Sequence, residues 1–151
     1  MKISDALQGI SLLSFDTSPL IYFVEQHPIY FDRMKAIMSY IDDQAVSGIS
    51  SGLTLTEILT FPIRLGKISL VNRYEEILLN TRGFHLAPID VKTCRTAADL
   101  RARHNLKTPD ALQVAAALEA NCDAFLTNDL GIKRVTEIRV LVLDELELDE
   151  S

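Results

Sequence analysis

The stretch from Thr108 to Asp129, TPDALQVAAALEANCDAFLTND, constrains the fold more than any other part of the chain. Thr108 is a favoured N-cap residue and Pro109 suits the first helical position, so a helix should begin here with Asp110 in its first turn. After a turn, a short apolar run ends at Asp129. The spacing predicts a helix, a turn, a buried strand and a loop.

The helix predicted here is rich in alanine and leucine, so its apolar face is smooth enough to pack closely on a sheet. The helix macrodipole favours an anion at Asp110. Asp129 lies just past a strand, at the edge where open α/β sheets bind ligands. We therefore expect these two carboxylates to face one cleft.

Strand-like and helix-like segments alternate along the whole chain, which indicates a mainly parallel sheet covered by helices on both faces. A length of 151 residues suits one domain. Residues 1–11 are expected to form a short, mobile lead-in, residues 12–143 the folded domain and residues 144–151 an acidic tail. The expected strands span residues 10–15, 45–49, 84–89, 124–126 and 140–143.

Asp16 stands at the end of the first expected strand, again at the ligand-binding edge. It could serve only as the N-cap of the next helix, because Asp is a favoured cap and Pro19 a favoured early helical residue. Ser18 could cap that helix alone, however, and this would leave Asp16 free. Asp16 is therefore a site candidate only together with distant partners.

Glu57 is the single acid of an otherwise apolar helix, which should follow a break at residues 50–52 and be ended by Pro62 and Gly66. A carboxylate is costly to bury without a partner or a cation. The simpler interpretation is a polar seam that reaches solvent, and this helix alone favours it.

The charge distribution says more than the net charge of −6. Five acids fall within residues 144–151, so residues 1–143 hold 15 basic and 16 acidic groups. A group of basic residues precedes the helix expected to begin at Thr108. It permits a phosphate-backbone substrate, but a solvated charged face is the favoured interpretation. The basic group consists of Arg95, Arg101, Arg103, His104 and Lys107.

The motifs of several enzyme classes are absent from the sequence. No GxGxxG follows the first strand, and neither GxxxxGK[ST] nor GxSxG occurs, which argues against dinucleotide, P-loop and serine-hydrolase sites. The three histidines, His27, His85 and His104, are too scattered for a zinc site.

Cysteine usage and the first residues bear on location. Cys94 and Cys122 have no CxxC spacing and are interpreted as reduced thiols of a cytoplasmic protein. No apolar run reaches the length of a membrane span. Residues 1–15 carry only Lys2 as a basic residue and no cleavage pattern, so neither membrane association nor a secretory signal is expected.

The remaining candidates are four acids at strand ends and on helices: Asp16, Glu57, Asp110 and Asp129. Clustered carboxylates repel one another unless a proton or a cation neutralises the group. Oxygen ligands without His or Cys suit Mg²⁺ or Mn²⁺. Such an ion acidifies a water molecule and stabilises charge on a phosphoryl group, so the acids predict a phosphodiesterase or phosphoryl-transfer site.

Four strings, FDTSPLIYF, LTLTEILT, KTPDALQVAAAL and FLTND, occur in this order. With their spacing, the chain resembles the PIN domain of VapC-type toxins from about Leu12 to Leu143. The resemblance implies a three-layer α/β/α sandwich with a central parallel sheet, and a ribonuclease that uses Mg²⁺ or Mn²⁺. It also implies a homodimer and a small antitoxin protein whose peptide covers the site.

Carried over by position, Asp16, Glu57, Asp110 and Asp129 match the acids of the family motif. Thr127 and Asn128 match the polar pair beside the last acid. The resemblance raises Glu57 above the solvent-seam interpretation. The chain departs from the family at Ile132, where members often carry an aromatic residue.

The leading hypothesis is an endoribonuclease in which Asp16, Asp110 and Asp129 hold the ion, while Glu57 places or deprotonates the attacking water. Thr127 and Asn128 are predicted to contact the substrate. RNA phosphates would lie near the basic residues Arg95, Arg103 or Lys107.

Two other classes remain. A PIN-like binding module would receive a partner's arginine in the acidic pocket without turnover, and metal-dependent RNA cleavage would separate it from the nuclease. A receiver domain or an aspartate-nucleophile phosphatase would share the doubly wound fold. Such a phosphatase needs an Asp where this chain has Ser18, which weakens that reading.

Overall fold

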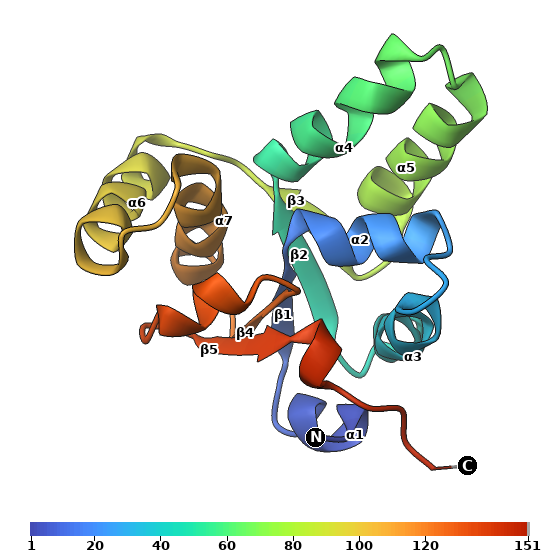
Figure 1. Cartoon of the computed structure of the whole chain (residues 1–151), viewed down its shortest axis with the longest axis horizontal. Helices are drawn as coiled ribbons and strands as arrows, with labels where there is room; N and C mark the ends of the chain where they lie inside the picture. Colours follow the sequence, from blue (N-terminus) through green and yellow to red (C-terminus); the bar gives the residue numbers. More distant parts are fainter. Residues whose placement is uncertain (151) are drawn as a thin grey trace.

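A five-stranded sheet lies at the centre of the protein (Figure 1). The computed structural model describes residues 1–150. The strands are β1 Leu12–Phe15, β2 Ser47–Ser51, β3 Phe84–Ala87, β4 Ala124–Thr127 and β5 Arg139–Val142. They pair in the order β3-β2-β1-β4-β5, and every pair is parallel, so all carboxyl ends lie at one edge of the sheet.

Helices cover both faces of this sheet. They are α1 Ile3–Leu7, α2 Thr17–Val24, α3 Phe31–Asp42, α4 Gly52–Arg64, α5 Ile68–Asn80, α6 Val91–His104 and α7 Thr108–Glu119, with 3₁₀ turns η1 Leu130–Arg134 and η2 Leu143–Glu145. Figure 1 shows α6 and α7 on one side of the sheet and α2 and α3 on the other, while α4 and α5 form a projecting hairpin. The α/β/α architecture expected from the sequence is confirmed.

The two faces of the sheet carry separate apolar cores, because side chains alternate along each strand. Leu13 and Phe15 of β1 pack with the helices α1 to α5, whereas Phe125 of β4 packs beneath α6 and α7. Gly48 of β2 lies where the first core is tightest. A Cβ atom there would lie 2.7 Å from Cδ1 of Ile41, so a larger residue would force its neighbours apart.

The prediction that residues 1–11 form a mobile lead-in is wrong. This segment contains α1, whose side chains Ile3, Ala6 and Leu7 are buried in the same core as Leu13 and Phe15. The Ile3 amide donates to the Glu147 carbonyl at 2.9 Å, and the Glu147 amide donates to the Met1 carbonyl at 2.8 Å. The acidic tail therefore packs along the start of the chain, which provides the apolar and hydrogen-bonding partners that local sequence could not reveal.

Ser50 and Ser51, expected to break the chain, instead form the end of β2 and are buried. Their hydroxyls are satisfied inside the protein, because Ser50 Oγ donates to the Phe15 carbonyl at 2.7 Å and Ser51 Oγ donates to Gln113 Oε1 at 2.6 Å. Strand β2 therefore spans Ser47–Ser51 rather than residues 45–49.

One helix start differs from expectation, and one helix end falls within the expected region. Lys107, not Thr108, is the N-cap of α7, and no side chain caps this helix. Helix α4 includes Pro62 and ends at Arg64, between the two residues expected to end it, because proline removes only its own backbone bond and the Leu65 amide closes the next turn. Within the described part of the chain, no helix combines the length and apolar character needed to cross a membrane.

Candidate active site

Four acids lie at or near the carboxyl edge of the sheet. Asp16 directly follows β1, and Asp129 lies just beyond β4, the neighbour of β1 in the sheet. Asp110 stands in the first turn of α7, and Glu57 lies in α4. The parallel topology therefore gathers side chains that are far apart in the sequence.

Asp16 is both the N-cap of α2 and part of this acidic group. Its Oδ1 accepts from the Thr17 amide and its Oδ2 from Thr127 Oγ1, each at 2.8 Å. The expectation that Ser18 would cap α2 and leave Asp16 free is wrong. Burial raises the pKa of the Asp16 carboxyl to about 6, and the charges of Asp110 and Glu57 add to this rise, while the bonds from Thr127 and Thr17 oppose it.

Asp110 shares the electrostatic environment of the other acids. Burial raises its pKa, and the negative charges of Asp129 and Glu57 contribute further. The positive charges of Lys107 and Arg134 lower the same pKa. Asp110 feels the charges of Asp129 and Glu57, and Asp16 feels those of Asp110 and Glu57, so the four predicted acids lie within electrostatic range of one another and form an acidic cluster in that sense.

Glu57 is exposed to solvent, as its helix suggested, but it is also anchored at the site. Thr17 Oγ1 donates to Glu57 Oε1 at 2.8 Å, and Gln113 Nε2 lies 3.3 Å from the same oxygen. These bonds link α4 to α2 and α7. Glu57 is thus held beside Asp16 while one face of its carboxylate reaches water.

Thr127 and Asn128 hold the edge of the sheet together. Thr127 is 0% exposed, donates to Asp16, and accepts from the Asp129 amide at 3.0 Å. The predicted substrate contact by Thr127 is therefore replaced by a structural one, since no solvent-facing surface remains. Asn128 Oδ1 accepts from the Asp144 amide at 2.9 Å, and this bond connects the loop that carries Asp129 to the start of the acidic tail.

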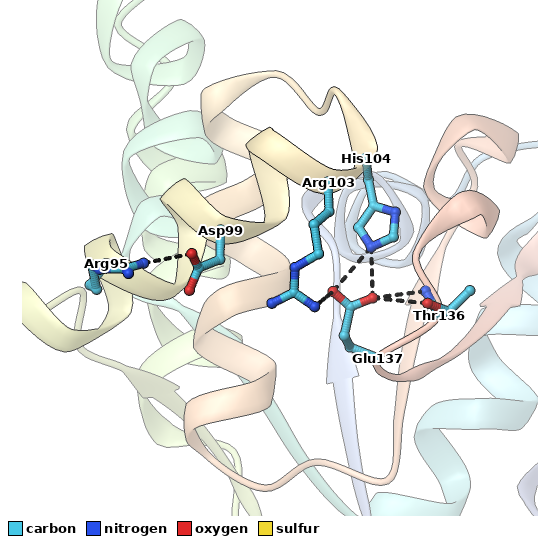
Figure 2. Close-up of polar contacts among 6 residues, drawn as sticks. All are labelled: Arg95, Asp99, Arg103, His104, Thr136 and Glu137. Atoms are coloured by element: carbon cyan, nitrogen blue, oxygen red, sulfur yellow. Dashed lines mark hydrogen bonds and ion pairs between the residues drawn. The ribbon is translucent and has the colours of Figure 1, made fainter.

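Two of the three basic residues predicted to meet RNA are paired elsewhere. Figure 2 shows Arg95 bound to Asp99 on α6, and Arg103 bound to Glu137, at 2.6 and 3.4 Å. His104 also binds Glu137, through Nε2 at 2.6 Å. The structure brings Lys107 to the acidic cluster, because Lys107 is among the charges that act most strongly on Asp110, and neither Arg95 nor Arg103 is.

Sequence reasoning missed three residues of the site. Thr17 and Gln113 bond to Glu57, and Arg134 lies beside Asp129. A Cβ atom at Gly131 would lie 3.1 Å from Asp129 Oδ1 and 3.6 Å from Arg134 Nη2. Gln113 had left a signal: it is a lone amide in an alanine-rich helix, one turn beyond Asp110.

The chemistry of this donor set fits a hard divalent ion. Among residues 1–150, no three His, Cys, Asp or Glu side chains form a group that could hold a metal ion as they stand. The ligands at hand are carboxylate oxygens, which Mg²⁺ and Mn²⁺ prefer. The raised pKa values of Asp16 and Asp110 express the cost of gathering negative charge away from water, and a bound dication would relieve that cost.

Solved structures share this fold. The VapBC2 complex of Rickettsia felis, bound to a promoter DNA fragment, is 15% identical with a TM-score of 0.69, covering 87% of this chain and 98% of that one. The DNA-bound VapBC of Salmonella typhimurium is 16% identical with a TM-score of 0.68, covering 89% and 99%. VapC20 of Mycobacterium tuberculosis, a sarcin-ricin loop cleaving toxin, is 16% identical with a TM-score of 0.64, covering 84% and 98%.

No curated protein matches this chain in sequence. The sequence profile of the PIN domain matches residues 14–138, which include the four acids at the carboxyl edge. This match spans most of the chain and agrees with the fold of the solved structures. The resemblance seen in the sequence is thereby confirmed: the chain belongs to the PIN domain family.

Proposed function

We propose that the protein is a metal-dependent endoribonuclease and the toxin of a toxin-antitoxin pair. The observation that carries this proposal is the acidic cluster, in which burial and the neighbouring charges of Asp110 and Glu57 raise the pKa of Asp16 to about 6. Membership of the PIN domain family supports it. The similar fold of VapC20, a sarcin-ricin loop cleaving toxin, supports RNA as the substrate.

In this proposal, Asp16, Asp110 and Asp129 would hold Mg²⁺ or Mn²⁺, directly or through water. The bound ion would acidify a water molecule and neutralise charge that develops on the phosphate. Thr127 and the Thr17 amide keep the Asp16 carboxylate in place with bonds of 2.8 Å. These bonds stabilise the ionised form and so oppose the effect of burial on its pKa.

Glu57 is the proposed general base. Its Oε1 already accepts from Thr17, so the carboxylate has a defined position from which to take a proton of the attacking water. Lys107 and Arg134 carry the positive charges that lower the pKa of Asp110, and we propose that they contact phosphates beside the scissile bond. Arg95 and Arg103, already paired with acids, are the weaker candidates for RNA contacts.

The test uses purified protein, a structured RNA, and buffers with Mg²⁺, Mn²⁺ or EDTA. We expect internal cleavage that needs the metal and falls by about 100-fold or more in Asp110→Asn. Asp43→Asn, an exposed carboxylate at the end of α3, is the matched control and should keep wild-type cleavage. Equal cleavage by Asp110→Asn and wild type, after identical purification, would remove the site assignment.

A partner protein is supported by an exposed apolar surface on the projecting hairpin of α4 and α5. Phe61, Ile63, Leu65 and Ile68 are 61–71% exposed there. The similar structures from Rickettsia felis and Salmonella typhimurium are VapBC complexes, and we propose a small antitoxin as partner and a homodimer as the assembly. Light scattering of the pure protein would measure the dimer, and co-expression with the neighbouring reading frame would reveal the antitoxin.

A non-catalytic binding module is the second candidate. It is favoured by Lys107 and Arg134, whose charges lower the pKa of Asp110 and show that the acidic cluster accepts cationic neighbours. In that case a partner's arginine would occupy the pocket. Metal-independent binding of an arginine-containing peptide, together with no RNA cleavage in Mn²⁺, would favour this candidate over the nuclease.

A further inference from the structure

Gln113 is a buried amide at the junction of four elements. It lies on α7 and is 2% exposed. Its Oε1 accepts from Ser51 Oγ of β2 at 2.6 Å. Its Nε2 lies 2.8 Å from Thr54 Oγ1 of α4 and 3.0 Å from Thr17 Oγ1 of α2. Both ends of the amide are therefore satisfied inside the protein.

The Phe15 carbonyl determines which hydroxyl donates in the bonds that Thr54 makes with Ser50 and Gln113. Ser50 Oγ donates its only proton to the Phe15 carbonyl at 2.7 Å. Ser50 and Thr54 hydroxyls lie 2.7 Å apart, so Thr54 must be the donor of that bond. Thr54 has then used its proton and can only accept from Gln113 Nε2. The amide orientation inferred from Ser51 agrees with this.

The direction on the Thr17 side follows from the carboxylate. An ionised Glu57 only accepts, so Thr17 Oγ1 donates to Glu57 Oε1 at 2.8 Å. Thr17 has then used its proton and accepts the second N–H of Gln113. The two N–H groups of one amide thus direct both hydroxyls. No hydrogen bond from residues 1–150 reaches Glu57 Oε2, which leaves that oxygen open to accept a proton.

We infer that Gln113 is a positioning residue for Glu57: its amide orients the Thr17 hydroxyl, which occupies Oε1 and leaves Oε2 as the proton-accepting oxygen. This inference rests on the proposed nuclease function. Gln113 is too deeply buried to touch substrate, so it acts on the reaction only through Glu57, which it reaches by way of Thr17 and by its own 3.3 Å contact with Oε1. Loss of such a supporting bond typically lowers activity by about 10–100-fold.

The test compares Gln113→Met, which keeps the size and removes the amide, with Val114→Ala. Val114 is the next residue of α7 and packs in the second core, so its truncation disturbs packing without touching the bonds to Glu57. We expect Gln113→Met to lower kcat for RNA about 10–100-fold with KM unchanged within about threefold. Val114→Ala should keep kcat within about threefold at equal folded fraction.

A double-mutant cycle keeps the test sharp if Gln113→Met is poorly folded. Thr17→Val removes the donor to Glu57 while leaving the interior of α7 intact. If both residues act in one path, adding Gln113→Met to Thr17→Val should lower kcat less than about threefold further. Fully multiplicative losses, or a Gln113→Met kcat equal to that of Val114→Ala, would overturn the inference.

Hydrogen exchange in the metal-free protein tests the inference without a measurement of activity. The side-chain amide protons of Gln113 should exchange with solvent much more slowly than those of Gln26 and Gln44, which are exposed. Thr17→Val should shift the Gln113 amide resonances. Rapid exchange would overturn the inference alone. Absence of metal-dependent cleavage by the wild-type protein would overturn the proposed function, and this inference with it.

Discussion

The partly buried carboxylate of Asp16 should destabilise the metal-free protein at neutral pH. Burial raises its pKa from the ordinary 3.8 to about 6. At about 1.36 kcal/mol per pKa unit, this difference corresponds to a free-energy cost of about 3 kcal/mol for the ionised form in the folded protein. Replacement of Asp16 by Asn removes the charge, and an amide oxygen can still accept from the Thr17 amide.

The pH window follows from the direction of the shift. Because the pKa is raised on folding, the unfolded chain loses its proton above about 3.8 while the folded protein keeps it until about 6. The contribution of Asp16 to stability is therefore present below the unfolded value and is lost as pH rises through the folded one. Asp16→Asn should match wild type near pH 4 and exceed it by up to about 3 kcal/mol at pH 8.

Urea unfolding in EDTA at pH 4.5, 6 and 8 measures this difference. Asp43→Asn, at an exposed carboxylate, is the control and should change the free energy of unfolding by less than about 0.5 kcal/mol at each pH. Added Mn²⁺ should reverse the order, because ligand binding stabilises only the protein that retains Asp16. A difference that does not grow between pH 4.5 and 8, or a less stable Asp16→Asn at pH 8, would refute the reasoning.

Three further outcomes are expected. Gly48→Ala should lower the free energy of unfolding by about 1–3 kcal/mol in a urea titration, because the added Cβ would lie 2.7 Å from the nearest atom. Gly52→Ala should be nearly neutral in the same titration, because its Cβ would lie 3.7 Å from the nearest atom. Thr127→Val should lower the free energy of unfolding by about 1–3 kcal/mol and reduce cleavage, because it removes the buried hydroxyl that donates to the Asp16 carboxylate at 2.8 Å. Thr127→Ser, which keeps a hydroxyl, should restore both stability and cleavage. Lys107→Glu should raise KM for RNA about tenfold and Arg95→Glu less than about twofold; equal effects would contradict the placement of these cations.

The local pattern of the sequence was sufficient to predict the layered arrangement of helices and sheet. Alternating strand-like and helix-like segments predicted the parallel sheet, and the carboxyl ends of parallel strands meet at one edge whatever the details of packing. Asp16 and Asp129 could therefore be placed at that edge from their positions after apolar runs.

The errors share one physical cause, which is that distant segments satisfy groups that look unsatisfied locally. Ser50 and Ser51 resemble chain breakers until their hydroxyls find the Phe15 carbonyl and Gln113. Residues 1–11 resemble a mobile lead-in until α1 meets Glu147.

What the sequence determined alone is the class of fold and the identity of the acids, because periodicity and residue type are properties of short segments. Only the tertiary structure decided which atoms those acids touch: Thr127 on Asp16, Thr17 and Gln113 on Glu57, and Lys107 near Asp110. Hydrogen bonds require agreement to within fractions of an ångström between groups on separate elements. That agreement arises when the helices and strands pack together, and no local pattern encodes it.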